Sequence, residues 1–306
     1  MTRTITARAP GKINVHFRVG PPREDGYHDV ASLYLAISLF EDVVATARID
    51  GEHSLSLGAG STAVTDPEDF PLGPSNLALR AARALADATG HAGGVHLEVV
   101  KRVPIAGGMG GGSADAAAAL VACNALWGTG LTREELGRIG AGLGADVPFA
   151  LSGGAAVGLG IGDELSPLLL RSRTDWVILP ASYGLSTPAV YARLDELRAG
   201  RDVETPREVD PGVVQALVAG DHALLQGLVF NDLTPAAMDL APELAAVLEM
   251  GDAAGALASL VSGSGPTVAL LAAGPRHAAE IANQLEDESG LAARAVHGPV
   301  HGASIV

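Results

Sequence analysis

The sequence predicts an α/β protein of two domains. Its 306 residues, of which 48% are hydrophobic, can bury a large core, and a chain of this length is more often two domains than one. Apolar residues alternate along much of the N-terminal half, which is typical of strands, and recur at helical spacing in other segments. A glycine-rich segment joins one of these strands to one of these helices. This mixture of patterns indicates the α/β class.

The N-terminal part is expected to consist mainly of strands. Residues 3–19 alternate in polarity, but Pro10 and Gly11 interrupt them, so two strands with a break are predicted. On the second of these strands Lys12 and Asn14 share one face. Further strands are expected at 33–39 and 43–49, after a polar, turn-rich segment at 21–28.

The remaining segments mix helices, strands and loops. A loop is expected at 58–75, helices at 76–89, at 113–127 and from Thr132, a strand at 95–103 and an exposed loop at 198–211. Thr132 and Glu135 form a capping box at the start of their helix. From about residue 160 short strands alternate with Ala- and Leu-rich helices. We therefore predict a first domain at 1–160 and a second at 161–306, with the final residues returning to the first.

The charge and the cysteine content exclude several classes of function. The net charge is -15 and Lys and Arg are scattered, which disfavours a nucleic-acid binder. An anionic ligand must therefore be held by local backbone N–H groups and a few placed cations. The single cysteine, Cys123, excludes an intrachain disulfide and a cysteine-based zinc site. With no apolar leader and no membrane-length apolar run, the chain is expected to be a soluble cytoplasmic protein.

The glycine-rich segment 107–113 is the main candidate for a binding site. Five of its first six residues are glycine, which lacks Cβ and accepts positive φ, so consecutive N–H groups can converge on an anion. The following helix start adds the positive end of its dipole. The segment lacks the Lys of a Walker A loop and the chain position of a Rossmann fingerprint. By itself it fits either a phosphate-binding loop or a tight turn that packs a helix against a strand.

Two further segments accompany this loop in a fixed order. Residues 9–14 read Ala-Pro-Gly-Lys-Ile-Asn, residues 104–113 contain the loop, and residues 261–267 read Val-Ser-Gly-Ser-Gly-Pro-Thr. The ordered triplet resembles the three motifs of the GHMP kinases, a superfamily that includes galactokinase, homoserine kinase and mevalonate kinase. The resemblance implies two α/β domains with a central cleft, ATP on the first domain and the substrate shared by both. The glycines of the third motif are expected to pack the second domain against the phosphate loop. The resemblance places the phosphates of ATP against Gly107, Gly108, Met109, Gly110, Gly111, Gly112 and Ser113.

Four more segments narrow the resemblance to one branch of the superfamily. They are Asp25-Gly26-Tyr27-His28, the triple glycine at 110–112, residues 144–149 and residues 186–191. Together they resemble the kinases of 4-diphosphocytidyl-2-C-methyl-D-erythritol, which belong to the non-mevalonate pathway of isoprenoid biosynthesis. The implied reaction transfers the γ-phosphate of ATP to the 2-hydroxyl of this alcohol, which carries a cytidine diphosphate group.

Asp146 and Lys12 match the catalytic aspartate and lysine of these kinases. A tertiary alcohol is a crowded, poor nucleophile, and a positioned carboxylate can accept its proton, which is typically worth about 10²–10⁴ in rate. A neighbouring lysine keeps the carboxylate ionised and stabilises charge on the hydroxyl or the γ-phosphate. Taken singly, the two residues would also fit a turn aspartate and a solvated surface lysine, but the surrounding motifs favour catalytic roles.

The resemblance also assigns residues to the acceptor substrate. Tyr27, His28 and Tyr191 match positions that hold the cytosine by stacking and by hydrogen bonds, which suits aromatic rings and an imidazole. Ordinary half-buried packing is the alternative for these three side chains. Asn14 and Thr187 match positions near the rest of the substrate.

The adenosine and the metal are defined by fewer residues. Asn76 and Lys101 match positions around the adenosine of ATP, although Lys101 equally fits a surface charge at the end of a strand. Where the family loop often continues with a second serine, Ser113 is followed by Ala114, which removes one hydroxyl from the phosphate site. Asp115 is expected to cap the helix rather than approach a metal. We expect no protein-based metal site, and Mg²⁺ should arrive with ATP, held mostly by phosphates and water.

Two rival functions remain open. Another GHMP kinase, acting on homoserine, mevalonate or a sugar, would share the glycine loop but has no reason to keep Tyr27, His28 and Tyr191 together. A catalytically silent nucleotide-binding regulator would not need both Lys12 and Asp146. We expect a small-molecule substrate with a cytidine diphosphate group, no nucleic-acid or membrane partner, and a monomer or homodimer.

Overall fold

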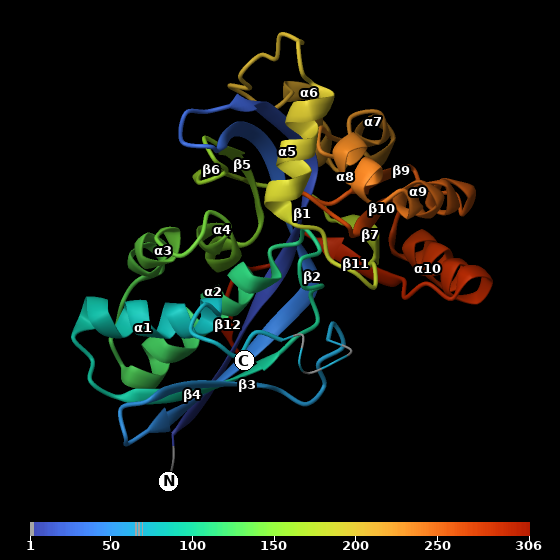
Figure 1. Ribbon diagram of the computed structural model, residues 1–306. Coiled ribbons are helices and arrows are strands. Elements are labelled where there is room, and N and C mark those ends of the chain that lie inside the picture. Colours follow the sequence, from blue (N-terminus) through green and yellow to red (C-terminus); the bar gives the residue numbers. More distant parts are fainter. Residues whose placement is uncertain (1–2, 65, 67, 69) are drawn as a thin grey trace.

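The computed structural model describes residues 3–64, 66, 68 and 70–306. Within this part of the chain the strands form two sheets, of eight and four strands, and helices pack on both (Figure 1). The larger sheet comes mainly from the N-terminal half and the smaller one from the C-terminal half. The predicted α/β class is confirmed.

A long antiparallel hairpin of β1 (Thr4–Pro22) and β2 (His28–Arg48) organises the larger sheet. The predicted breaks within these two segments are wrong, because each segment is one continuous strand. Pro10 has no N–H to donate, and the pairing absorbs it as a register shift between Pro10 and Lys12 instead of ending the strand. At this irregularity the N–H of Lys12 donates to the carbonyl of Met109 at 3.0 Å. The shift therefore attaches the glycine loop to β1.

The other strands of the larger sheet extend this hairpin. The order is β12-β1-β2-β4-β3, in which β3 runs parallel to β4, and short strands β5, β6 and β8 attach to β2, β5 and β1. Their bounds are β3 (His53–Leu57), β4 (Gly94–Val100), β5 (Ala155–Leu159), β6 (Glu164–Leu168), β8 (Phe230–Asn231) and β12 (Ser304–Ile305).

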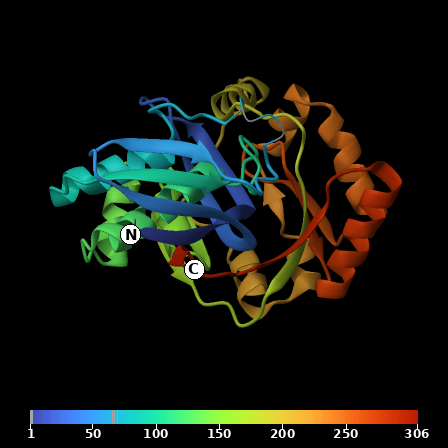
Figure 2. The same cartoon turned by 90° about the horizontal axis from the view of Figure 1, so that it is seen from below.

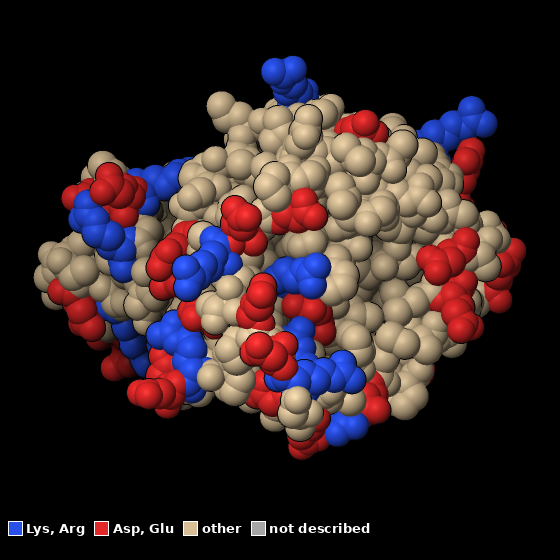
Figure 3. Space-filling model, turned by 90° about the horizontal axis from the view of Figure 1, so that it is seen from above, with Lys and Arg blue, Asp and Glu red and all other residues tan. Residues whose placement is uncertain are grey.

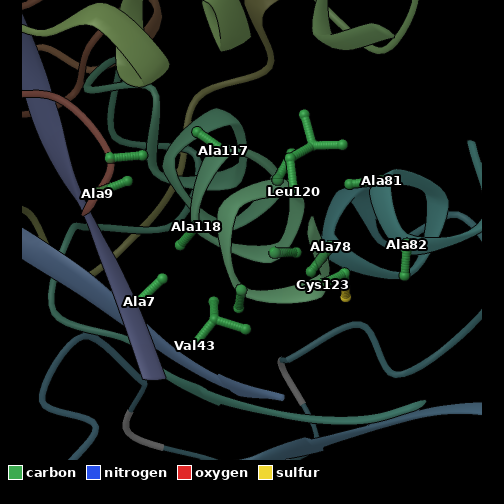
Figure 4. Packing of buried hydrophobic residues seen from close by; sticks show 14 of the residues in the cluster. Ala7, Ala9, Val43, Ala78, Ala81, Ala82, Ala117, Ala118, Leu120 and Cys123 are labelled. Carbon is green, nitrogen blue, oxygen red and sulfur yellow. The ribbon is translucent and has the colours of Figure 1, made fainter. Parts of the chain in front are cut away.

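The helices of the first half pack around α2 (Gly111–Trp127), which is buried along most of its length. Figure 4 shows Ala117, Ala118 and Leu120 of α2 among small apolar side chains of α1 and of strands β1 and β2. Because alanine side chains are small, α2 can lie close to its neighbours, and few aromatic side chains are needed to fill the core between them. Cys123 is fully buried here, and burial raises the pKa of its thiol, so it stays protonated and serves as a packing residue. The neighbouring helices are α1 (Leu77–Thr89), α3 (Arg133–Ala141) and α4 (Val147–Ser152).

The predicted start of α3 is confirmed, and that of α1 differs by one residue. Thr132 and Glu135 form the capping box of α3, with both of its reciprocal hydrogen bonds present. Asn76 precedes α1 and accepts a hydrogen bond from the N–H of Ala78 at 2.9 Å. The helix therefore begins one residue later than the predicted range, because Asn76 is its cap.

The smaller sheet has the antiparallel order β11-β7-β10-β9 and separates two apolar layers. Alternate residues of β7 face opposite sides: Val177 packs toward α10, whereas Trp176 and Ile178 pack toward α6 and the hairpin of the larger sheet. Figure 2 shows the smaller sheet and the helices of the C-terminal half beside the larger sheet. The bounds are β7 (Thr174–Leu179), β9 (Ala258–Val261), β10 (Val268–Ala272), β11 (Arg294–Gly298), α5 (Thr187–Leu197), α6 (Pro211–Ala219), α7 (His222–Gln226), α8 (Thr234–Leu240), α9 (Glu243–Ala253) and α10 (Pro275–Ser289).

We propose that the division between the domains lies between β6 and β7. β6 is the last strand of the continuous N-terminal segment to join the larger sheet, and β7 is the first strand of the smaller one. The chain end returns to the larger sheet, where β12 pairs with β1 and His301 forms a bridge with Gly153. This arrangement supports a boundary close to the predicted one, with a C-terminal return.

The surface carries both signs of charge. On the face shown in Figure 3, Lys and Arg side chains are interspersed with Asp and Glu and form no continuous basic area. Across the described residues, none of the helices combines the length and the apolar character needed to span a bilayer.

Candidate active site

A cleft of about 470 Å³ brings the three sequence motifs together. Lys12 and Asn14 of β1, Asp146 at the start of α4, and Thr187 and Tyr191 of α5 all line it. The glycine loop from Gly107 to Gly112 forms one wall, and Gly263 and Ser264 of the third motif form another. Residues that are far apart in the sequence thus meet at one place, as the predicted roles require.

The glycine loop leads directly into the N-terminus of α2. Gly110 adopts the left-handed conformation at φ 68° and precedes the helix without any side-chain cap. The first N–H groups of a helix have no partner inside the helix, so they remain available to an anion. The helix starts at Gly111, and the loop can therefore present backbone donors to phosphate without a basic patch.

The third motif packs closely against this loop, as expected. The hydroxyl of Ser262 donates to the carbonyl of Gly108 at 3.3 Å, and the carbonyl of Ser262 accepts from the N–H of Gly265 at 2.8 Å. A Cβ on Gly108 would lie 1.9 Å from the carbonyl oxygen of Ser262, and Gly108 has φ 74°. Only glycine fits this contact between the loop and the second domain.

Gly108→Ala is expected to weaken ATP binding and to lower the midpoint of thermal unfolding, because the added methyl clashes with fixed backbone and the conformation is strained. Calorimetric titration with ATP and a thermal unfolding scan would measure both effects. Gly137→Ala is the matched control, because Gly137 lies within α3 and a Cβ there meets nothing within 4 Å. Wild-type ATP affinity in Gly108→Ala would contradict the close packing.

Lys12 and Asp146 form an ion pair at the floor of the cleft. The ammonium nitrogen lies 3.5 Å from Oδ2 of Asp146, and it donates to Oδ1 of Asn14 at 2.7 Å and to the carbonyl of Gly108 at 3.3 Å. Asn14 in turn donates to the hydroxyl of Ser32 at 2.7 Å. Asp146 is the N-cap residue of α4 but makes no side-chain capping bond, so its carboxylate is free to face the cleft. A carboxylate beside a fixed ammonium is suited to accept a proton.

Tyr34 is a cleft residue that the sequence analysis missed. It pairs with Asn14 in the hairpin register, and its ring lies 5.4 Å from the ammonium of Lys12. Burial, together with the charge of Asp146, holds the pKa of its phenol well above the usual range, so it remains neutral. The only available signal was its register across the hairpin, which a single sequence does not show.

Of the three residues predicted to hold the cytosine, one lines the cleft and two do not. The rings of His28 and Tyr191 are 4.9 Å apart, and Tyr191 lines the cleft. Burial, with a smaller effect of the Asp146 charge, raises the pKa of Tyr191. Tyr27 is 60% exposed and, like His28, lies outside the cleft lining. Thr187 contacts Ser264 through their hydroxyls at 2.8 Å.

The two predicted adenosine residues line the cleft, but their polar groups already have partners in the fold. Asn76 caps α1, and its amide donates to the carbonyl of Pro71 at 2.8 Å. Lys101 is 2% exposed, and its ammonium donates to Glu41 at 2.5 Å and to Asp115 at 2.8 Å. The alternative of a surface charge at Lys101 is therefore wrong, and its contact with adenosine stays a prediction.

Asp115 does not cap α2, so that expectation is wrong. It lies one turn inside the helix, where its side chain turns toward Lys101 instead of the free N–H groups. Burial raises the pKa of Asp115, and the charge of Lys101 lowers it by less. Burial likewise raises the pKa of Glu41 to about 8, with Lys101 opposing and Asp115 reinforcing the change. The two carboxylates thus share one buried cation and hold a proton more tightly than exposed acids do.

Comparison with known proteins identifies the family. Residues 76–154 match the model of the GHMP kinases N terminal domain, and residues 213–290 match that of the GHMP kinases C terminal domain. A protein of Arthrobacter sp. (strain FB24), named 4-diphosphocytidyl-2-C-methyl-D-erythritol kinase, is 56% identical over 99% of this chain and 95% of its own length. A protein of Streptomyces coelicolor (strain ATCC BAA-471 / A3(2) / M145) with the same name is 51% identical over 92% of each chain.

Solved structures agree with this result. A crystal structure of 4-(cytidine 5'-diphospho)-2C-methyl-D-erythritol kinase is 33% identical, with a TM-score of 0.74 over 97% of this chain and 98% of the other. L. major mevalonate kinase, in complex with R-mevalonate, has a TM-score of 0.77 at 17% identity over 98% of each chain, which shows the shared fold alone. The two-domain GHMP kinase fold and the kinase class predicted from the sequence are confirmed, and the chain belongs to the GHMP kinase family.

Proposed function

We propose that this kinase transfers the γ-phosphate of ATP to the 2-hydroxyl of 4-diphosphocytidyl-2-C-methyl-D-erythritol. One observation carries the proposal: Lys12 and Asp146 form an ion pair beside the glycine loop. The full-length relatives named for this reaction support the choice of substrate. The N-terminal domain would hold ATP, and the acceptor would lie between the two domains.

Phosphoryl transfer depends mainly on positioning and on stabilising charge, and the cleft offers groups for both. The backbone N–H groups around Gly110 and Gly111 would hold the phosphates. Asp146 would accept the proton of the 2-hydroxyl as the oxygen attacks phosphorus. Lys12 would hold Asp146 in its ionised form and offset negative charge on the transferring group. Asn14 would fix the position of Lys12, to which it is already hydrogen-bonded.

The acceptor is proposed to lie with its alcohol near Asp146 and its base near α5. Thr187 and Tyr191 lie one helical turn apart on α5, and both line the cleft. The acceptor would therefore extend along this face of the helix, from its alcohol to its base. His28 and Tyr191 would hold the cytosine, and Tyr27, the exposed neighbour of His28 in the chain, would stack on it.

Mg²⁺ is proposed to accompany ATP. In the part of the chain that the structure describes, no group of three or more His, Cys, Asp or Glu side chains could hold a metal. Asp115 nevertheless lines the cleft, and its Oδ1 is buried without a hydrogen-bond partner among the described residues. A carboxylate oxygen in this position suits the ion or one of its waters. When bound with ATP, Mg²⁺ supplies positive charge to the phosphates.

A coupled assay of ADP release tests the function directly. The purified chain should release ADP with the cytidylyl substrate and ATP, and should release little with mevalonate or homoserine. Mass spectrometry of the product should show one added phosphate. Turnover of mevalonate or homoserine in place of the cytidylyl alcohol would overturn the proposed substrate, and ATP binding without turnover of any of them would favour the silent regulator.

A further inference from the structure

Asp195 makes a contact that the transfer of phosphate does not require. Its Oδ1 lies 3.0 Å from Nε2 of His28, and the imidazole is 5% exposed. Neither Asp195 nor His28 lines the cleft around the ion pair, and of the two only His28 is placed against the acceptor above. Any effect of this carboxylate on the reaction must therefore pass through His28.

Helix α5 holds the imidazole from two sides. Thr187, Tyr191 and Asp195 follow one another at intervals of four residues, so they lie on one face of the helix. The ring of Tyr191 packs against the ring of His28 at 4.9 Å, while the carboxylate of Asp195 contacts its Nε2 edge. Both the plane and the rotation of the imidazole are fixed by this pair.

An ionised carboxylate fixes the tautomer as well. A carboxylate accepts hydrogen bonds and donates none, so the neutral imidazole must carry its proton on Nε2. Nδ1 is then an acceptor. It makes no hydrogen bond within the described part of the chain, so its lone pair is left for an incoming group.

We propose that Asp195 is a positioning residue that determines the choice of base. By holding the proton of His28 on Nε2, it makes Nδ1 an acceptor that receives the exocyclic amino group of cytosine. Uracil presents a carbonyl oxygen at that position, and two acceptors would face each other without a proton between them. The inference rests on the proposed function, because it takes His28 to contact the base.

The test compares kcat/KM for the cytidylyl substrate and its uridylyl analogue. Wild type should prefer the cytidylyl compound. Asp195→Asn keeps the side-chain shape, but its amide can donate to Nε2 and shift the proton to Nδ1, so the preference should fall by about tenfold to a hundredfold, mainly through KM. Asp195→Ala should lower the preference as well. Glu196→Gln is the matched control on the same helix, because Glu196 is exposed and its carboxylate pairs with Arg193, and it should keep the wild-type preference.

Nitrogen NMR of His28 supplies a second readout that needs no variant. Wild type should show the neutral ring protonated at Nε2. Protonation at Nδ1 in wild type, or an unchanged preference in both folded Asp195 variants, would overturn the inference alone. Failure of wild type to phosphorylate the cytidylyl substrate would overturn the proposed function, and this inference with it.

Discussion

Asp146→Asn is expected to lower kcat by about 10²–10⁴, the usual range for loss of a general base, while ATP still binds. Asparagine has nearly the size and shape of aspartate but cannot accept the proton of the acceptor hydroxyl. Asp146 makes no capping bond to α4, and its ion pair with Lys12 is 3.5 Å long, so the fold should not depend on its charge. The loss should therefore fall on kcat and not on the affinity for ATP.

The coupled ADP assay at saturating substrates measures this loss, and calorimetric titration measures ATP binding. Asp87→Asn is the matched control, because Asp87 is an exposed acid on α1, away from the cleft, and its replacement should leave kcat unchanged. Two results would contradict the role of Asp146: nearly wild-type turnover in the variant, or loss of ATP binding while the thermal unfolding curve is unchanged.

The residues that could be predicted from the sequence lie in short contiguous motifs. Lys12 and Asp146 are recognisable because the contiguous motifs around them resemble those of the GHMP kinases. The glycine loop is recognisable because consecutive residues form it. Helix ends such as Thr132 follow from local hydrogen bonding and are predictable for the same reason. The prediction of two strands in the place of β1 was wrong. Pro10 favours a break locally, but β1 pairs with β2 along the whole hairpin, and this pairing keeps the strand continuous.

The missed residues all act through long-range contacts. Tyr34 reaches Lys12 by register across the hairpin, and Glu41 reaches Lys101 from the neighbouring strand β2. Asp195 carried a faint signal, since it stands four residues beyond the end of the predicted site segment 186–191, but its partner His28 lies 167 residues earlier in the chain. The hydrophobic pattern within one segment cannot predict contacts between residues that lie so far apart in the sequence.

The buried group of Glu41, Lys101 and Asp115 illustrates how these contacts support the site. Glu41 accepts hydrogen bonds from the N–H groups of Arg102 and Val103 at 2.8 and 3.2 Å, in addition to the ammonium of Lys101. It thereby fixes the segment that leads into the glycine loop. Asp115 ties the same lysine to α2. The lysine joins β2, β4 and the start of α2 beneath the loop.

Lys101→Met is therefore expected to destabilise the protein by about 3–5 kcal/mol, because it leaves two buried carboxylates without a cation. The loss should grow as the pH rises. The folded-state pKa of Glu41, at about 8, and that of Asp115 are both raised above their ordinary values, so their protonated forms favour folding. That contribution is present at acidic pH and is lost as the pH rises through about 8. Removing Lys101 removes the charge that opposes these shifts, which steepens the decline.

Urea unfolding without ATP, at acidic, neutral and alkaline pH, measures this effect apart from any contact of Lys101 with nucleotide. The decisive control is the triple variant Glu41→Gln, Lys101→Met, Asp115→Asn, which removes all three charges at once. It should regain much of the stability that the single variant loses and should show a flatter pH dependence, because no buried charge is left unpaired. If the triple variant were no more stable than Lys101→Met, the lysine would matter for its packing and not for its charge. A single variant as stable as wild type at neutral pH would show that water reaches these carboxylates, and would leave the loop segment supported by backbone contacts alone.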